Sequence, residues 1–288
     1  MWPTNGLPAL SGEFLYVSSS NLDSIYELSI NSSTGSRSYV NQFQVESPRA
    51  ICGPIAIHPS NEFIFDGMLV GANGGPSSLD SLDVGDSIYS GKIFRLNKPV
   101  LVAGGAGSAA GIALDPPGRC AYVTETHGIT RYSIGQHTGT VTALGDTAVG
   151  PGAAFAIAVQ PNAGSVVLVT RRDDQQAYEF TTGGNCSLTA NGNLLLSTQS
   201  SDAEEVAFHP ALAVAYVSDP HLDTVFEIGI NPPLTVSLLG AVTPPISSQY
   251  FSESAAWWFI RAATFSIPQR AHPAAQRFPN SLSTRTDC

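Results

Sequence analysis

Apolar runs and polar turns follow one another in a fixed order along this chain. In residues 111–134 and 205–230, an apolar run leads to a proline turn, a second apolar run contains Tyr-Val, and a polar loop precedes a third apolar run. Short apolar runs bounded by turn residues are typical of β-strands. Each of these segments therefore predicts three consecutive strands.

Three other segments carry part of the same pattern. Residues 54–65 and 156–170 repeat its first half, and residues 14–30 repeat its second half. The turn prolines are 57, 45 and 49 residues apart, and they are Pro59, Pro116, Pro161 and Pro210. This spacing is typical of four-stranded propeller blades. We therefore predict an all-β fold, a β-propeller of four-stranded antiparallel blades with about five recognisable repeats.

The ends of the chain do not follow the pattern. The most compact repeat predicts strands at residues 111–114, 120–124, 129–134 and 140–144, whereas the first repeat lacks its opening strand. Nothing after about residue 240 resembles a blade. We expect propeller repeats over residues 1–240, a non-repeat tail over residues 241–288, and an incomplete ring.

Composition and charge limit the classes of partner. The 27 glycines and 20 prolines among 288 residues fit a turn-rich all-β domain. A net charge of -10 opposes binding to a phosphate backbone, so we expect no nucleic-acid partner. Because the sequence has neither a membrane-length apolar run nor the segments of a signal peptide, we expect a soluble protein without a membrane partner. Cytoplasmic and exported locations both stay open.

Three patterns that could suggest a cofactor are interpreted structurally. The four cysteines are widely spaced and show no CxxC pair, so we expect buried thiols and no zinc site. The polar segment 71–86 contains Asp80, Asp83 and Asp86, but their spacing is not that of a calcium loop, and we expect a solvated surface loop. The segment 105–110 resembles a dinucleotide fingerprint, but prolines follow where a helix is required. We expect no cofactor and no bound metal.

The blade topology predicts which side chains meet. In an antiparallel meander, the connection before the first strand and the connection after the second strand lie at the same end of the blade. These connections should gather polar side chains around one mouth of the central channel, which we call the rim. The rim residues are Asp66, Glu125, His127, Arg171, Arg172, Asp173, Asp174, Glu204, Glu205, Asp219, His221 and Asp223. His58 and His209 belong to the turns at the opposite mouth and should have structural roles.

Two chemistries could use this rim. Histidine beside carboxylates can position water and transfer its proton, while Arg171 or Arg172 could hold an anionic substrate or stabilise charge on an acyl oxygen. Alternatively, carboxylates such as Asp66, Glu125 and Asp219 could converge on a divalent cation. The spacing does not choose between them.

The repeat phrases suggest a family. FLYVSSSNLDSIYELSINSSTG, GIALDPPGRCAYVTE and EVAFHPALAVAYVSD resemble the repeats of seven-bladed lactonase-type propellers, the 6-phosphogluconolactonase-like and YVTN-repeat proteins. The resemblance implies hydrolysis of a sugar lactone. In catalytic members an Arg-His pair precedes the strand before the His-Pro turn, and Asn-Glu follows the next Tyr-Val strand. Here the matching positions are Glu204-Glu205 and Asp219-Pro220.

This interpretation of the sequence leaves two hypotheses for the function. In the first, the protein hydrolyses a sugar lactone, with Glu125, His127, Arg171 and His221 as catalytic residues. The expected substrate-binding residues are Arg172, Asp173, Glu204, Glu205 and Asp219. In the second, the protein is a non-catalytic propeller that binds a ligand or a protein partner through its loop face.

Overall fold

Short antiparallel strands make up almost all of the regular structure. The computed structural model describes residues 14–19, 22–31, 33–44, 50–51, 53–70, 78–84, 93–96, 100–101, 109–126, 128–150, 152–162, 164–171, 174–199, 202–231 and 234–243. Within these ranges, no helix is both long and apolar enough to cross a membrane.

The strands form five successive sheets, which we call blades 1 to 5. Blades 3, 4 and 5 each have four strands in chain order. Blade 3 contains β10 (Gly111–Leu114), β11 (Cys120–Glu125), β12 (Gly128–Ile134) and β13 (Val141–Thr147). Blade 4 contains β14 (Ile157–Val159), β15 (Val166–Thr170), β16 (Gln176–Thr182) and β17 (Leu188–Leu195). Blade 5 contains β18 (Val206–Phe208), β19 (Val214–Asp219), β20 (Thr224–Asn231) and β21 (Thr235–Val242).

The two N-terminal blades are less regular. Blade 1 contains β1 (Phe14–Ser19), β2 (Ser24–Ile30) and β3 (Arg37–Gln44), in that order. Blade 2 contains β4 (Ala50–Ile51), β5 (Ile55–Ile57), β6 (Phe63–Val70), β7 (Ser78–Asp83), β8 (Phe94–Arg95) and β9 (Val100–Leu101). In blade 2, β5 pairs with β6, which pairs with β7. Only blade 1 lacks a described strand in the innermost position.

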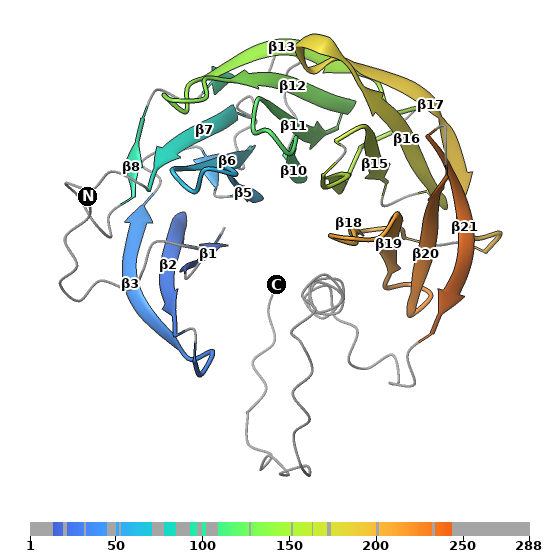
Figure 1. Ribbon diagram of the computed structural model, residues 1–288, viewed down its shortest axis with the longest axis horizontal. Helices are drawn as coiled ribbons and strands as arrows, with labels where there is room; N and C mark the ends of the chain where they lie inside the picture. Colours follow the sequence, from blue (N-terminus) through green and yellow to red (C-terminus); the bar gives the residue numbers. More distant parts are fainter. Residues whose placement is uncertain are drawn as a thin grey trace.

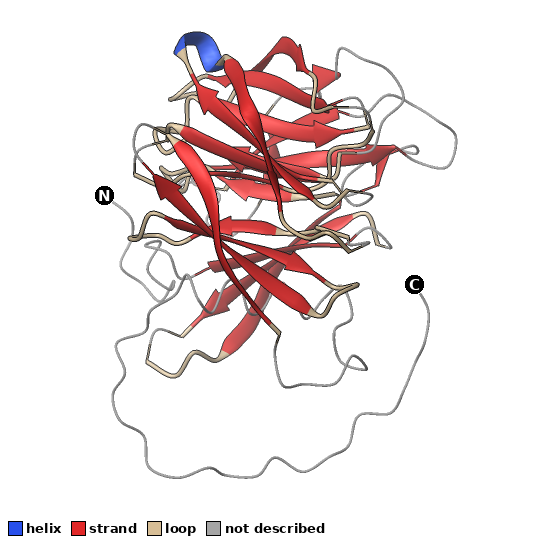
Figure 2. Cartoon of the chain, turned by 90° about the vertical axis from the view of Figure 1, so that its right-hand side faces the viewer, coloured by secondary structure: helices blue, strands red, loops and turns tan. Residues whose placement is uncertain are grey.

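The blades follow one another around an arc (Figure 1). The strands β5, β10 and β18 lie toward the centre, and β13, β17 and β21 lie at the periphery (Figure 1). Figure 2 shows the strands running from one face of the arc to the other, so that connections collect at two opposite faces. This arrangement confirms the predicted β-propeller.

The core lies between successive blades. One example is the cluster that joins Leu168 and Ala177 of blade 4 to Ala215, Val217 and Phe226 of blade 5. Similar clusters join blades 1 and 2, blades 2 and 3, and blades 3 and 4. A blade that lies between two others therefore buries both of its faces. This burial explains why its second strand is apolar at nearly every position.

The proline turns hold the arc together at one face. His58 is buried, and its two ring nitrogens lie 2.7 Å from the Ser60 hydroxyl and 3.0 Å from the Gly118 carbonyl in the next blade. The Asn162 amide donates to the Pro210 carbonyl of the following blade at 2.8 Å. Since His209 Nδ1 accepts from the backbone of its own turn, the predicted structural roles of both histidines are confirmed.

The structure corrects the expected surface loop in blade 2. Ser78–Asp83 is the strand β7, and Asp80 is completely buried. Its Oδ2 accepts from Arg95 Nε at 2.7 Å, and the Arg95 guanidinium lies over the Phe43 ring of blade 1. The serines and aspartates make this segment resemble a loop in sequence. It is nevertheless a strand, and its Leu79 and Leu82 pack into the core on opposite faces. Asp86 lies outside the described residues.

The expectation of free thiols is also wrong for two of the four cysteines. Cys120 of β11 and Cys186, which follows β16, form a disulfide that joins blades 3 and 4. Their sequence separation of 66 residues hides this pairing, because only the packing of neighbouring blades brings them together. Cys52 and Cys288 lie outside the described residues.

Candidate functional site at the rim

Three ionisable side chains occupy equivalent positions in successive blades. In the strand pairings, Ala121, Val167 and Ala215 face the last residue of the innermost strand of their blades. Four residues beyond these positions lie Glu125, Arg171 and Asp219. Because the blades share one register, all three residues lie at the same mouth of the propeller, as the repeat predicts.

These three residues are buried although each lies at the end of a strand. Glu125 is 4% exposed, Arg171 5% and Asp219 1%. Charged side chains are rarely buried without a partner, because they lose hydration that a strand end would normally retain. Buried ionisable groups that recur at the mouth of a fold mark a candidate functional site.

Backbone and hydroxyl hydrogen bonds connect this mouth from blade to blade. The amide of Ala154, before blade 4, donates to the Glu125 carbonyl at 3.1 Å. The buried Thr170 hydroxyl, next to Arg171, donates to the Glu204 carbonyl at 2.6 Å. Thr124 makes the corresponding bond to the carbonyl of Phe155. These hydrogen bonds therefore hold the backbone of the rim in blades 3, 4 and 5.

Arg171 is held in one orientation by two partners. Its Nη1 donates to Asp174 Oδ2 at 3.1 Å and to the Tyr178 hydroxyl at 3.0 Å. The Tyr178 hydroxyl donates to the same Asp174 oxygen at 2.5 Å, and the guanidinium lies 5.7 Å from the centre of the Tyr178 ring. Burial raises the pKa of Tyr178, and its bond to Asp174 raises it further, so the phenol stays protonated.

Two glycines make room for this arginine. Gly150 and Gly152 have φ values of 55° and 122°, which side chains rarely adopt. A Cβ on Gly152 would lie 1.9 Å from Arg171 Nη2, and one on Gly150 would lie 3.2 Å from the Tyr178 hydroxyl. Sequence reasoning missed Tyr178 and both glycines. The Gly-Pro-Gly run at residues 150–152 is the signal that could have indicated a close backbone approach.

Asp219 has one carboxylate oxygen that can accept a further hydrogen bond. Its Oδ1 accepts from the Leu222 amide at 2.9 Å, which fixes the carboxylate against the following turn. Its Oδ2 is buried and has no hydrogen-bond partner among the residues that the structure describes. A buried acceptor without a partner is costly, so it is suited to water or a hydroxyl group of a ligand.

The other expected site residues differ in burial, and three of them lie outside the described residues. Glu204 is 6% exposed, and its backbone carbonyl accepts the hydrogen bond from the Thr170 hydroxyl. Glu205 is half-buried, and its amide donates to the Ser218 hydroxyl, whereas the His221 side chain is exposed. His127, Arg172 and Asp173 lie outside the described residues. Among the described residues, no three His, Cys, Asp or Glu side chains are grouped to hold a metal ion.

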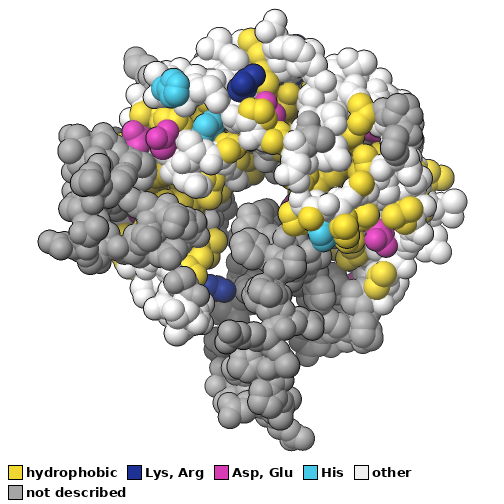
Figure 3. Space-filling model, viewed as in Figure 1, with side chains coloured by type: hydrophobic (Ala, Val, Ile, Leu, Met, Phe, Trp, Pro, Cys, Tyr) yellow, Lys and Arg dark blue, Asp and Glu magenta, His cyan; other side chains and the backbone are white. Residues whose placement is uncertain are grey.

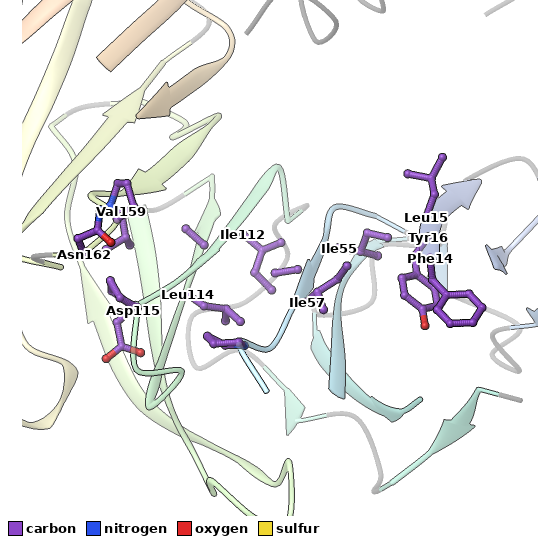
Figure 4. Close-up of a pocket in the computed structure, with 15 residues that line it drawn as sticks. Phe14, Leu15, Tyr16, Ile55, Ile57, Ile112, Leu114, Asp115, Val159 and Asn162 are labelled. Carbon is purple, nitrogen blue, oxygen red and sulfur yellow. The ribbon is translucent and has the colours of Figure 1, made fainter. Parts of the chain in front are cut away.

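The opposite mouth contains a cavity of about 650 Å³. Its wall is formed by the innermost strands and proline turns, including Ile57, Leu114 and Val159, with Tyr16 of blade 1 on one side (Figure 4). Figure 3 shows an opening at the centre of the arc with hydrophobic side chains on its wall. The polar rim and this apolar cavity are therefore two different environments.

Comparison with known proteins identifies the fold. No protein-family model matches the sequence, and no curated protein matches it. The periplasmic gluconolactonase PpgL of Pseudomonas aeruginosa has a similar structure, with a TM-score of 0.64 and 17% identity over 81% of this chain and 68% of that one. A candidate 6-phosphogluconolactonase from Bacteroides fragilis gives 0.64 and 12% identity, with coverages of 81% and 68%.

Propellers of other kinds are also similar. Chaetomium thermophilum Sqt1, solved with the N-terminus of ribosomal protein L10, has a TM-score of 0.54 and 16% identity over 80% of this chain and 59% of that one. The chain spans about two thirds of the length of its lactonase-like neighbours. Its fold is a β-propeller similar to those of the lactonase-like proteins, as the repeat phrases predict.

Proposed function

We propose that this lactonase-type propeller binds a small polyhydroxylated lactone at the rim and hydrolyses it. The observation that carries the proposal is the burial of Glu125, Arg171 and Asp219 at one equivalent position in three successive blades. Structural residues of a repeat recur in kind from blade to blade, as the Tyr-Val pairs do, whereas this position holds a different ionisable group in each of the three blades. A shared position at the mouth is the arrangement in which distant segments can act on one ligand.

The proposed reaction adds water to the lactone carbonyl and opens the ring. Asp219 Oδ2 accepts a hydrogen bond from the attacking water, and His127 or His221 takes a proton from that water and delivers it to the ring oxygen as its bond to the carbonyl carbon breaks. The positive charge of Arg171 stabilises the negative charge that develops on the carbonyl oxygen. The product is the open-chain hydroxy acid.

The remaining residues would bind the substrate. Glu125 and Glu204 can accept hydrogen bonds from sugar hydroxyls, and Arg172 can bind a phosphate or carboxylate group. Glu205 and Asp173 complete the acceptor groups of this mouth. The Asp174-Tyr178 pair holds the Arg171 guanidinium, so its orientation does not have to be fixed when the substrate binds.

Hydrolysis of glucono-1,5-lactone and of 6-phosphogluconolactone tests this function. We expect a rate clearly above that of buffer for at least one of them, and a loss of about tenfold or more in Asp219→Asn, within the range of one positioned acid or base group. Asp115→Asn is the matched control, because Asp115 lines the opposite cavity and its backbone contact with Cys120 can be kept by an amide oxygen. A folded wild-type protein that is no faster than buffer would exclude the proposal.

The second candidate is a non-catalytic propeller that binds a ligand or a protein partner. The apolar cavity at the opposite mouth favours it, since apolar concave surfaces of this size are typical binding sites. Sqt1 is a propeller of similar fold that was solved with a bound peptide segment. This function predicts that wild type and Asp219→Asn hydrolyse the lactones at the same rate as buffer.

A further inference from the structure

The two blades at the ends of the arc each have one open face. Blades 2, 3 and 4 lie between two others, whereas blades 1 and 5 lie at the ends (Figure 1). Among the described residues, no core cluster joins blade 1 to a blade before it or blade 5 to a blade after it. We call these two open surfaces the blade 1 end face and the blade 5 end face.

Blades 1 and 5 share one register, so their residues can be compared position by position. Tyr16 pairs with Glu27 in blade 1, and Tyr216 pairs with Glu227 in blade 5. In both blades the register shifts directly after the glutamate, as it does at a β-bulge. The residues of β1 and β2 therefore correspond in order to those of β19 and β20.

The blade 1 end face leaves open the positions that blade 5 buries against blade 4. Val217 and Phe226 belong to the core cluster between blades 4 and 5 and are 0% and 4% exposed. The corresponding residues of blade 1 are Val17, which is 42% exposed, and Tyr26, which is half-buried. The blade 1 end face therefore has the side chains of a blade that packs against a preceding one, but no described blade covers it.

The blade 5 end face leaves open the positions that earlier blades bury against the next blade. Ile25 of blade 1 and Ala177 of blade 4 are completely buried in such contacts, whereas Val225 at the same position of blade 5 is only half-buried. Val242 pairs with Val225 and is 62% exposed. Its counterpart in blade 4 is Leu194, which pairs with Ala177 and packs against the cluster shared with blade 5. The blade 5 end face is therefore suited to pack against a following blade.

The two end faces correspond to the two sides of one inter-blade contact. Between blades 4 and 5, Leu194 packs from the blade 4 side against the cluster to which Val217 belongs on the blade 5 side. Val242 and Val17 occupy the corresponding positions on the two end faces. Within one copy these faces lie at opposite ends of the arc (Figure 1). A second copy can therefore place its blade 1 after blade 5 of the first, as blade 5 follows blade 4.

The glutamate on the blade 5 end face is compatible with this packing. Glu27, at the position that corresponds to Glu227, is 3% exposed in blade 1 and accepts from the Tyr16 hydroxyl at 3.3 Å. Tyr216 lies opposite Glu227 in the same way. A tyrosine hydroxyl is thus available to each glutamate, which lowers the cost of burying the carboxylate.

We propose that the protein associates with itself head to tail, with the blade 5 end face of one copy packed against the blade 1 end face of the next. The contact is heterologous, because two different surfaces meet in it. It continues the series of inter-blade contacts and buries Val17 and Val242. The association does not depend on the hydrolysis proposed for the rim.

Mixing two variants of the full-length chain tests the head-to-tail contact. Val17→Asp blocks the blade 1 end face and Val242→Asp blocks the blade 5 end face, because a buried carboxylate without a partner opposes packing. In sedimentation experiments the average mass of wild type should at least double as its concentration rises, whereas each variant alone should stay monomeric. An equimolar mixture of the two variants should form dimers, since each variant keeps the face that the other lacks. Leu212→Asp is the matched control and should associate like wild type, because this 58% exposed side chain lies in the turn between β18 and β19.

A second measurement needs no variant. Amide hydrogen exchange of wild type in β2 and β20 should be about tenfold slower at high concentration than at low concentration, because association protects the end blades from local opening. Exchange in β11 of the central blade should not change. A wild type that is monomeric at every concentration, a variant mixture that stays monomeric, or end-blade exchange that does not depend on concentration overturns the proposal. Association that persists in either Asp variant of an end face, or is lost in Leu212→Asp, also overturns it, because the contact would then lie elsewhere.

Discussion

Arg171 shows how single residues determine the geometry of the rim. Its guanidinium is held by Asp174 and Tyr178 and lies directly beneath Gly152. Repeat alignment predicts that position 171 lies at the mouth, because it requires only the strand order. It does not predict the burial or the partners, since those depend on the conformation of the glycine-containing turn before blade 4.

We therefore expect Gly152→Ala to displace Arg171. The new Cβ would approach Nη2 to 1.9 Å, and alanine is strained at a φ of 122°. The free energy of unfolding should fall by about 1–3 kcal/mol, the usual cost of a residue forced into such a conformation. Gly184→Ala is the matched control, because a Cβ there meets nothing within 4 Å. Urea unfolding measures both, and equal midpoints would contradict the packing described for Arg171.

The second residue-scale prediction concerns Glu27. This side chain is 3% exposed, its Oε1 accepts from the Tyr16 hydroxyl at 3.3 Å, and burial raises its pKa. Because the folded-state pKa lies above the unfolded one, the folded state binds protons more readily, and stability falls as pH rises through the folded-state pKa. Glu27→Gln removes the buried charge and keeps the acceptor.

We expect Glu27→Gln to be more stable than wild type at pH 7 and to lose this advantage as pH falls below about 4, where the carboxyl is protonated in both states. The free energy of unfolding, measured by urea denaturation across this pH range, tests the prediction. Glu62→Gln is the matched control, since Glu62 is exposed. A Glu27→Gln variant that is less stable at neutral pH would mean that the charge itself stabilises blade 1.

At the scale of the elements, prediction succeeds where a proline turn separates two apolar runs. β10, β11 and β12 lie at or within one residue of the expected positions, because their turns and apolar runs are unambiguous. β7 is missed, because its core residues Leu79 and Leu82 are separated by polar residues that look like a loop. β17 begins at Leu188 and is not marked by an uninterrupted apolar run, because polar residues and Gly192, at a φ of 146°, occupy its middle.

The disulfide between blades 3 and 4 gives a prediction at this scale. Replacing both Cys120 and Cys186 by serine opens a loop with a separation of 66 residues, and chain-entropy arguments put the stabilisation from such a loop at about 4 kcal/mol. We expect the double variant to unfold at clearly lower urea concentration. Wild type with its disulfide reduced should behave in the same way. Unchanged midpoints for both would show that the cross-link does not restrict the unfolded chain.

At the scale of the molecule, the arc brings together residues that are far apart in sequence. Glu125 and Asp219 are nearly a hundred residues apart, yet they share one position in the blade. The repeat period therefore predicts the rim, and the missing opening strand of the first repeat predicts the uncovered edge of β1. No local motif marks the cavity at the other mouth, because its wall is assembled from strands of four different blades.

The most direct test of this account is a crystal structure of the protein with gluconate, the product of gluconolactone hydrolysis. We predict that gluconate binds at the rim, with its carboxylate near Arg171 and a hydroxyl group donating to Asp219 Oδ2. Gluconate bound instead among Ile57, Leu114 and Val159 at the opposite mouth would contradict the account. So would coordinates that leave Glu125, Arg171 and Asp219 on different sides of the molecule.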